Sequence, residues 1–258
     1  MSIIECGGNN MSNIKKIIAV MSGKGGVGKS FVTSLVAINL QREGYKVGVL
    51  DADITGPSIP KIFGVNKERA VMEGEKMVPV ESSKGTKVMS LNLLLQNENQ
   101  PVIWRGPLIG NTAKQFYEDT KWGDLDYLVI DLPPGTADVT LTVMQSIPID
   151  GMVIVTCPQD LVSLIVEKSV IMAEKMNIPI LGLVENMSYA TCPDCGEKIN
   201  IFGESKAESV AKDMNLNLLG KLPINSSMTK MCDSGTLESF SGTEDAFIDL
   251  GKTINGMI

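Results

Sequence analysis

The chain of 258 residues contains no histidine. This absence excludes Ser-His-Asp hydrolysis, histidine-ligated catalytic zinc and general base catalysis by histidine. Cysteine is scarce, and its odd count of five favours metal-binding, reactive or buried thiols over a framework of disulfides. The chemistry must therefore come from carboxylates, lysines, backbone amides, thiolates or a bound cofactor.

Long apolar runs are also missing. No stretch reaches the ~18 consecutive apolar residues typical of a membrane-spanning helix. The opening residues MSIIECGGNNMSNIKK lack the charged-then-apolar order of a signal peptide, so the sequence predicts a cytoplasmic protein. The formal net charge of −7 argues against sequence-independent binding to nucleic acid or to an anionic membrane.

Apolar, strand-like runs alternate with helical patterns through most of the chain. One helical pattern covers residues 161–176, and in another Val32, Leu35, Val36 and Leu40 recur at helical spacing. The alternation predicts right-handed βαβ units, and hence an α/β fold with a mainly parallel sheet and helices on both faces. The strand candidates are residues 17–21, 47–50, 127–130, 152–155 and 180–184.

Two segments depart from this rhythm. Residues 66–100 are turn-rich, with short apolar runs at 77–80 and 87–91, and they predict a small antiparallel insertion near the edge of the sheet. Residues 244–258 predict a closing amphipathic helix. The sequence thus predicts a flexible tail over residues 1–15 and a single domain over residues 16–258. The apolar side chains near one face of the closing helix are Phe247, Ile248, Leu250 and Ile254.

The strongest motif is Gly-Lys-Gly-Gly-Val-Gly-Lys-Ser, a full match to the P-loop pattern G-x-x-x-x-G-K-S. It lies between a strand candidate and a helical pattern, which favours a nucleotide site over a chance glycine-rich turn. Lys29 is expected to reach the β- and γ-phosphates and Ser30 to ligate Mg²⁺. The residues expected to surround the nucleotide are Gly23, Lys24, Gly25, Gly26, Val27, Gly28, Lys29, Ser30 and Phe31.

Acidic residues close two of the strand candidates. Asp51 and Asp53 lie in "VLDADITGPS", and Asp131 lies in "YLVIDLPPG". Ligands bind at the carboxyl ends of strands in such sheets, so these carboxylates are expected beside the P-loop rather than as plain strand ends and helix caps. No guanine-reading Asn-Lys-x-Asp follows a later strand, which favours ATP over GTP.

The P-loop resembles the deviant Walker A loop of the ParA/MinD/nitrogenase-iron-protein ATPases. The resemblance implies a face-to-face homodimer in which Lys24 engages the nucleotide of the other subunit, whereas local sequence alone would make Lys24 a solvated loop lysine. It also implies that Asp53, in switch I, positions the attacking water. Asp51 would lie nearer the magnesium shell, and Asp131 would hold Mg²⁺ through water.

The same resemblance implies three further contacts with the nucleotide. Gly135, in the Pro-Pro-Gly turn of switch II, would sense the γ-phosphate through its amide. Asn186 and Pro223 resemble the positions that the family places near adenine. The alternative for both of these residues is an ordinary turn.

Cys192 and Cys195 form a Cys-Pro-x-Cys-Gly pattern in a predicted metal-binding loop over residues 190–198. Backbone amides in such a knuckle can hydrogen-bond the sulfurs and stabilise thiolates. A redox dithiol, the main alternative besides a stray surface pair, is expected at a helix N-terminus instead. Because a tetrahedral site needs four ligands, two copies related by a two-fold axis could together hold an iron–sulfur cluster or zinc. Cys157 and Cys232 are predicted core thiols, and Cys6 a tail residue.

Five motifs in order narrow the resemblance: the P-loop, "DADITGPSIPKIFG", "WRGP", "DLPPGTAD" and "ENMS…CPDCG". Together they resemble the Mrp/ApbC subgroup from about residue 16 onwards. This resemblance implies a cytosolic, Mg-dependent ATPase that binds a [4Fe–4S] cluster between subunits through Cys192 and Cys195 and passes it to apo-proteins. Two alternatives stay open, a ParA/MinD-like spatial-organisation ATPase and the same fold with structural zinc in the knuckle. Two departures from the subgroup are Phe31, where threonine is usual, and a lone N-terminal Cys6.

Overall fold

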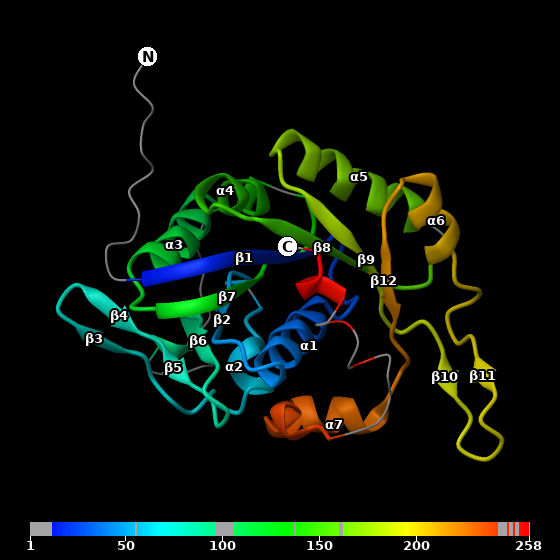
Figure 1. The fold of residues 1–258 in the computed structure, drawn as a ribbon, viewed down its shortest axis with the longest axis horizontal. Helices are drawn as coiled ribbons and strands as arrows, with labels where there is room; N and C mark the ends of the chain where they lie inside the picture. The colour runs from blue at the N-terminus through cyan, green and yellow to red at the C-terminus, as the bar shows by residue number, and fades with distance from the viewer. Residues whose placement is uncertain are drawn as a thin grey trace.

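An eight-stranded sheet runs through the centre of the protein, in the order β12-β9-β8-β1-β7-β2-β6-β5 (Figure 1). The computed structural model describes residues 12–54, 56–95, 106–136, 138–159, 162–241, 247, 250 and 253–257. All neighbouring strands of this sheet are parallel except β5, which pairs antiparallel with β6. The strands are β1 (Ser12–Ser22), β2 (Val47–Asp51), β5 (Val80–Glu81), β6 (Lys87–Met89), β7 (Gly123–Asp131), β8 (Gly151–Thr156), β9 (Ile180–Glu185) and β12 (Leu218–Lys221).

Helices cover both faces of the sheet (Figure 1). One face packs against α3 (Gly106–Glu118), α4 (Asp138–Ser146), α5 (Val162–Lys175) and α6 (Ala207–Asp213). The other face packs against α1 (Lys29–Arg42), α2 (Ile59–Ile62) and α7 (Ser226–Ser234). Successive residues of β1 alternate between the two cores, which explains why its second half is continuously apolar. The α/β fold with a mainly parallel sheet and helices on both faces is confirmed.

Short elements complete the architecture. Two isolated hairpins, β3 (Val71–Glu73) with β4 (Lys76–Val78) and β10 (Ala190–Thr191) with β11 (Lys198–Ile199), form separate two-stranded antiparallel sheets. Two short 3₁₀ helices, η1 (Leu91–Leu93) and η2 (Leu237–Ser239), follow β6 and α7. Among the described residues, no helix combines the length and apolar character that a bilayer crossing requires.

Two sequence-based boundaries change in the structure. The first folded residue was expected at position 16, but β1 already begins at Ser12, where it pairs with Gly123 of β7. Only β7 flanks this part of β1, since pairing with β8 starts at Ile18. The half-covered stretch is therefore mostly polar, with Ile14 as the one apolar residue among residues 12–16, and it lacks a strong strand signal. Residues 1–11 lie outside the described part of the chain.

The segment predicted as an antiparallel insertion is only partly separate. Its first hairpin, β3 with β4, stands alone, and β5 pairs antiparallel with β6 as expected. However, β6 itself joins the main sheet in parallel with β2. This pairing joins segments far apart in the chain, so the turn-rich sequence around β6 does not predict it. Residues 96–100 lie outside the described ranges, as do Ile248 and most of the polar side of the predicted closing helix. Phe247, Leu250 and Ile254 are buried in the core beside α1, as that helix predicts.

The close contact between the ends of α2 and α7 brings two walls of the functional site together. Gly64, just after α2, has φ +72°, and Gly235, just after α7, has φ +70°. A Cβ added to Gly64 would lie 2.5 Å from the carbonyl oxygen of Gly235. Only glycine allows both the left-handed backbone and this approach.

Replacing Gly64 tests this packing. A left-handed conformation costs a residue with a Cβ roughly 1–2 kcal/mol, and overpacking adds roughly 1–3 kcal/mol. We therefore expect Gly64→Ala to lower the free energy of unfolding by about 2–5 kcal/mol, measured by urea denaturation. Gly74→Ala is the matched control, because Gly74 has φ +66° but open space around its Cβ position. Equal losses in the two variants would show that the contact between α2 and α7 contributes nothing.

Candidate functional site

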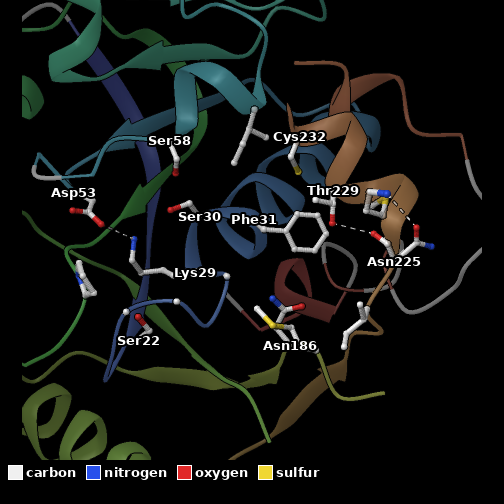
Figure 2. A pocket seen from close by; sticks show the side chains of 18 of the residues that line it. Ser22, Lys29, Ser30, Phe31, Asp53, Ser58, Asn186, Asn225, Thr229 and Cys232 are labelled. Atoms are coloured by element: carbon white, nitrogen blue, oxygen red, sulfur yellow. Dashed lines mark hydrogen bonds and ion pairs between the residues drawn. The ribbon is translucent and has the colours of Figure 1, made fainter. Parts of the chain in front are cut away.

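A cavity of about 460 Å³ opens at the carboxyl edge of the main sheet (Figure 2). The ends of β1, β2, β7, β9 and β12 reach it, and α7 forms the opposite wall. Ligands bind at this edge in doubly wound sheets. The residues that the sequence predicted and that line the cavity are Gly25, Gly26, Gly28, Lys29, Ser30, Phe31, Asp53, Asn186 and Pro223.

The P-loop turns into α1 at Gly28, whose backbone is left-handed with φ +81°. A Cβ at this position would collide with the side-chain amide of Asn186, just after β9, so both the left-handed backbone and this contact favour glycine. Gly28 provides no side-chain cap for α1. The first amides of the helix are therefore left for an anion, and the helix dipole adds positive charge at the same place.

Lys29 brings its ammonium into this cradle from the first turn of α1 (Figure 2). The side chain is 6% exposed, and its Nζ lies 2.7 Å from Oδ1 of Asp131 and 3.9 Å from Oδ2 of Asp53. These distances define ion pairs, but among the described residues no acceptor meets the angles of a hydrogen bond to Nζ. The attraction holds the ammonium in place while its N–H groups stay unsatisfied. Phosphate oxygens in the cavity would satisfy them, so the site fits a polyphosphate.

Asp131, at the end of β7, accepts hydrogen bonds from two hydroxyl groups of α1. Ser30 donates from Oγ to Oδ2 of Asp131 at 2.6 Å, and Thr33 donates from Oγ1 to Oδ1 at 2.7 Å. A serine hydroxyl and a carboxylate in direct contact form a hard oxygen donor set that fits hydrated Mg²⁺. Sequence reasoning missed Thr33, although its position four residues after Lys29 places it on the same face of α1.

Asp51 holds the loop after β2 through hydrogen bonds to its backbone amides. It is fully buried, and it pairs with Asp131 across the parallel strands β2 and β7. Burial, followed by repulsion from Asp131, raises the pKa of Asp51 to about 8. Its oxygens accept hydrogen bonds from the amides of Asp53 and Ile59 and from Oγ of Ser90. In this structure the carboxyl group thus braces the loop that presents Asp53 to the cavity.

The far end of the cavity is largely apolar. Phe31 lies in the cavity opposite α7, and its ring makes an edge contact with Phe247 at a centroid distance of 6.1 Å. Asn186 lines the same region, and its Nδ2 donates to the carbonyl oxygen of Val27 at 2.9 Å. An apolar slot with a few polar groups is typical of a site for a flat ring system. The sequence did not predict a contact with the nucleotide for the other residues that line the cavity, namely Ser22, Ser58, Ile62, Pro134, Met187, Ile224, Asn225, Met228, Thr229 and Cys232.

Some predicted residues lie behind the cavity wall. The amide of Gly135 donates to the carbonyl oxygen of Ser22 at 2.8 Å, so in this structure switch II is tied to β1. Lys24 is half-buried, and its carbonyl oxygen accepts a hydrogen bond from Oγ of Ser22. The predicted residues outside the set that lines the cavity, all within the described ranges, are Gly23, Lys24, Val27, Asp51, Asp131 and Gly135.

The cysteine knuckle lies at the tip of the hairpin β10–β11. The amide of Cys192 donates to the carbonyl oxygen of Glu197 at 2.9 Å, and the amide of Gly196 donates to the carbonyl oxygen of Cys192 at 3.0 Å. Hydrogen bonds to the sulfur from the amides of Cys195 and Asp194 and from the Cys195 thiol lower the pKa of Cys192. This lowered pKa is in line with the predicted stabilisation of a thiolate by backbone amides at Cys192.

The knuckle holds only half of a tetrahedral site. Within the described ranges, no group of three or more histidine, cysteine, aspartate or glutamate side chains could hold a metal ion. Cys157 is buried, as predicted, and burial raises its pKa. Cys232 is half-buried in α7 and lines the cavity, and burial raises its pKa to about 11. Cys6 lies outside the described residues.

A short hydrogen-bonded segment connects the cavity with the knuckle. Ser188 donates from its amide to the carbonyl oxygen of Leu222 and from its hydroxyl to the buried carboxylate of Glu185. Further along, the amide of Ile224 donates to the carbonyl oxygen of Tyr189, and Ala190 of β10 forms a bridge with Ile224. Ile224 also lines the cavity. The base of the hairpin is therefore fixed to the cavity wall.

Comparison with known proteins gives these features a context. The sequence model of the ParA family described as NUBPL iron-transfer P-loop NTPase matches residues 13–255. A protein from Clostridium perfringens, named iron-sulfur cluster carrier protein, is 52% identical over 240 residues, which are 90% of this chain and 84% of that protein. A protein of the same name from Methanocaldococcus jannaschii is 48% identical over 227 residues, covering 88% of this chain and 78% of the relative.

Among solved structures, the nucleotide-binding protein from Archaeoglobus fulgidus in complex with ADP is similar to this chain, with a TM-score of 0.80 and 45% sequence identity. The similarity covers 89% of this chain and 90% of that one. The resemblance to the Mrp/ApbC subgroup of deviant Walker A ATPases is thereby confirmed. The chain belongs to the ParA family of NUBPL iron-transfer P-loop NTPases.

Proposed function

We propose that this P-loop NTPase is a cytoplasmic, ATP-hydrolysing carrier that binds a [4Fe–4S] cluster between two copies of the chain and transfers it to apo-proteins. The observation that carries the proposal is the hydrogen-bonded segment from Glu185 to Ala190, which links the nucleotide cavity to a two-thiol knuckle. The relatives named as iron–sulfur cluster carriers support it.

The residues predicted from the sequence each have a role in the proposed hydrolysis. Lys29 and the free amides at the start of α1 bind the β- and γ-phosphates, and Phe31, Asn186 and Pro223 surround the base. Ser30 and Asp131 hold Mg²⁺, which neutralises phosphate charge when bound. The loop braced by Asp51 presents Asp53, which orients the attacking water.

Charge on the transferred phosphoryl group needs a further cation. Lys24 is in the P-loop but does not line the cavity of its own chain. The proposed role for Lys24 is therefore in the second copy of the dimer, where it stabilises the transition state as an arginine finger does. The amide of Gly135 senses the γ-phosphate by giving up its hydrogen bond to the carbonyl oxygen of Ser22 and donating to the nucleotide instead.

The cluster is the cargo of this cycle. Cys192 and Cys195 of one copy supply two thiolates, and the same residues of a second copy supply the other two. The lowered pKa of Cys192 favours ligation at neutral pH. The structural-zinc alternative uses the same thiolates, while the ParA/MinD-like alternative gives the knuckle no role.

Lys24→Ala separates binding from hydrolysis. We expect the variant to bind ATP almost as well as the unchanged protein, because Lys29 and the α1 amides remain. Its kcat should fall about 10³-fold or more, as for the loss of an arginine finger. Both quantities can be measured by nucleotide titration and by phosphate release. Lys67→Ala, at an exposed lysine, is the control. A Lys24 variant that hydrolyses ATP at the normal rate would remove the trans role.

The cysteine pair can be tested by anaerobic reconstitution with iron and sulfide. We expect the unchanged protein to take up about one [4Fe–4S] cluster per dimer, and the Cys192→Ser/Cys195→Ser variant to take up less than about a tenth of that iron, since four thiolates hold such a cluster. Iron content and absorbance give the readout. Cys232→Ser should behave like the unchanged protein. Full iron uptake by the double variant, or zinc in protein purified without oxygen, would contradict the proposal.

A further inference from the structure

Large apolar side chains are exposed on the loop that follows the cysteines. Ile199 is 50% exposed, Ile201 55% and Phe202 48%. They are three of the eight exposed large apolar side chains of the described chain, and they lie within four consecutive residues. Exposed apolar patches of this kind mark interaction sites. We call these three residues the knuckle patch.

The pairing of the hairpin relates the knuckle patch to the thiols. Ala190 pairs with Ile199 and Thr191 with Lys198, and the hydrogen bond from Cys192 to Glu197 continues the ladder by one more pair. Side chains alternate between the two faces of such a ribbon, and paired residues share a face. The register thus assigns Ile199 and Cys192 to the same face of the hairpin.

The chain's own fold does not cover this surface. Every residue from 193 to 204 is exposed, and the hairpin β10–β11 projects from the edge of the main sheet beyond β12 (Figure 1). Its base is fixed to the cavity wall through Ile224 and Ala190. A projecting hairpin with a fixed base can meet another molecule without a clash from the rest of the domain.

The thiol count identifies the partner. Within the described ranges, the two thiols of the knuckle form no metal-binding group with a third histidine, cysteine, aspartate or glutamate side chain, while a four-thiolate site needs two more thiolates. A second copy related by a two-fold axis supplies them, and the same axis brings each knuckle patch against its copy. Apolar side chains are complementary to themselves, whereas Asp194 and Glu197 beside the thiols would repel their copies. Besides the metal–thiolate bonds, the apolar residues are therefore the groups expected to contribute favourable free energy to the contact.

We propose that Ile199, Ile201 and Phe202 form the contact surface between two copies of this chain and shield the shared metal–sulfur centre from water. This inference rests on the proposed function, because it requires a cluster held by both knuckles. Burial of the patch at the two-fold axis lowers solvent access to the cluster, which slows loss of iron. The surface therefore sets both the stability of the dimer and the lifetime of its cargo.

The test compares two double variants of the full chain after anaerobic reconstitution with iron and sulfide. Ile199→Ser/Phe202→Ser removes two members of the knuckle patch. Val71→Ser/Met72→Ser is the matched control, since these side chains are 60% and 59% exposed on β3, away from the knuckle. Dimer dissociation is measured by analytical ultracentrifugation, and iron loss by the rate of transfer to the chelator bathophenanthroline disulfonate. ATP binding verifies that both variants are folded.

The expected result is specific to the knuckle patch. Its variant should dissociate at least about tenfold more readily and lose iron at least about tenfold faster than the unchanged protein, because the buried apolar contact is lost. The control should match the unchanged protein. A patch variant with normal dimer stability and normal iron loss would overturn the inference. The same holds if it loses only the transfer to an apo-ferredoxin, because the patch would then be a docking site for recipients. An unchanged protein that takes up no iron would instead refute the proposed function itself.

Discussion

A single buried lysine holds together the acidic end of the central sheet. Parallel pairing of β2 with β7 forces Asp51 and Asp131 side by side in a region without solvent, where two ionised carboxylates would repel each other strongly. The ammonium of Lys29, 2.7 Å from Asp131, offsets this repulsion. The P-loop, the start of α1 and the loop after β2 all take their positions from this arrangement. Because burial and this repulsion raise the pKa of Asp51 to about 8, its carboxyl group is mainly protonated at neutral pH, and the ammonium of Lys29 compensates the carboxylate of Asp131.

The same arrangement connects the cavity to the hairpin that carries Cys192 and Cys195. Asn186 contacts the P-loop through Val27, and the residues after it run directly into the hairpin that carries the thiols. Leu222 and Ile224 form backbone hydrogen bonds with Ser188 and Tyr189 of this segment. Ile224 lines the cavity, and Leu222 lies next to Pro223, which also lines it. A change in the P-loop on nucleotide binding can thus reach the base of the knuckle through a few hydrogen bonds. Under the proposed function, the nucleotide site, the cluster site and the dimer contact are therefore connected by one hydrogen-bonded path.

The sequence was sufficient wherever the determining interactions are local. The helical spacing of Val32 and Leu35, the turn of the P-loop glycines and the hydrogen bonds around Cys192 all depend on neighbours in the chain, and the structure has a helix at Lys29–Arg42, as that spacing predicts. It was insufficient wherever distant segments meet. The start of β1 at Ser12 depends on pairing with β7, and the entry of β6 into the main sheet depends on β2. The wall formed by α7 depends on the approach of Gly64 to Gly235. The catalytic roles of Asp53 and Lys24 stay predictions, since they concern bound nucleotide and a second copy.

Native mass spectrometry of anaerobically purified protein tests the central claim most directly. This account predicts a species with the mass of two chains and one cluster of four iron and four sulfide ions. It also predicts that replacing ADP by a non-hydrolysable ATP analogue changes the fraction of dimer that retains the cluster. A cluster retained in full by a single chain, or a dimer whose iron content ignores the nucleotide, would contradict it.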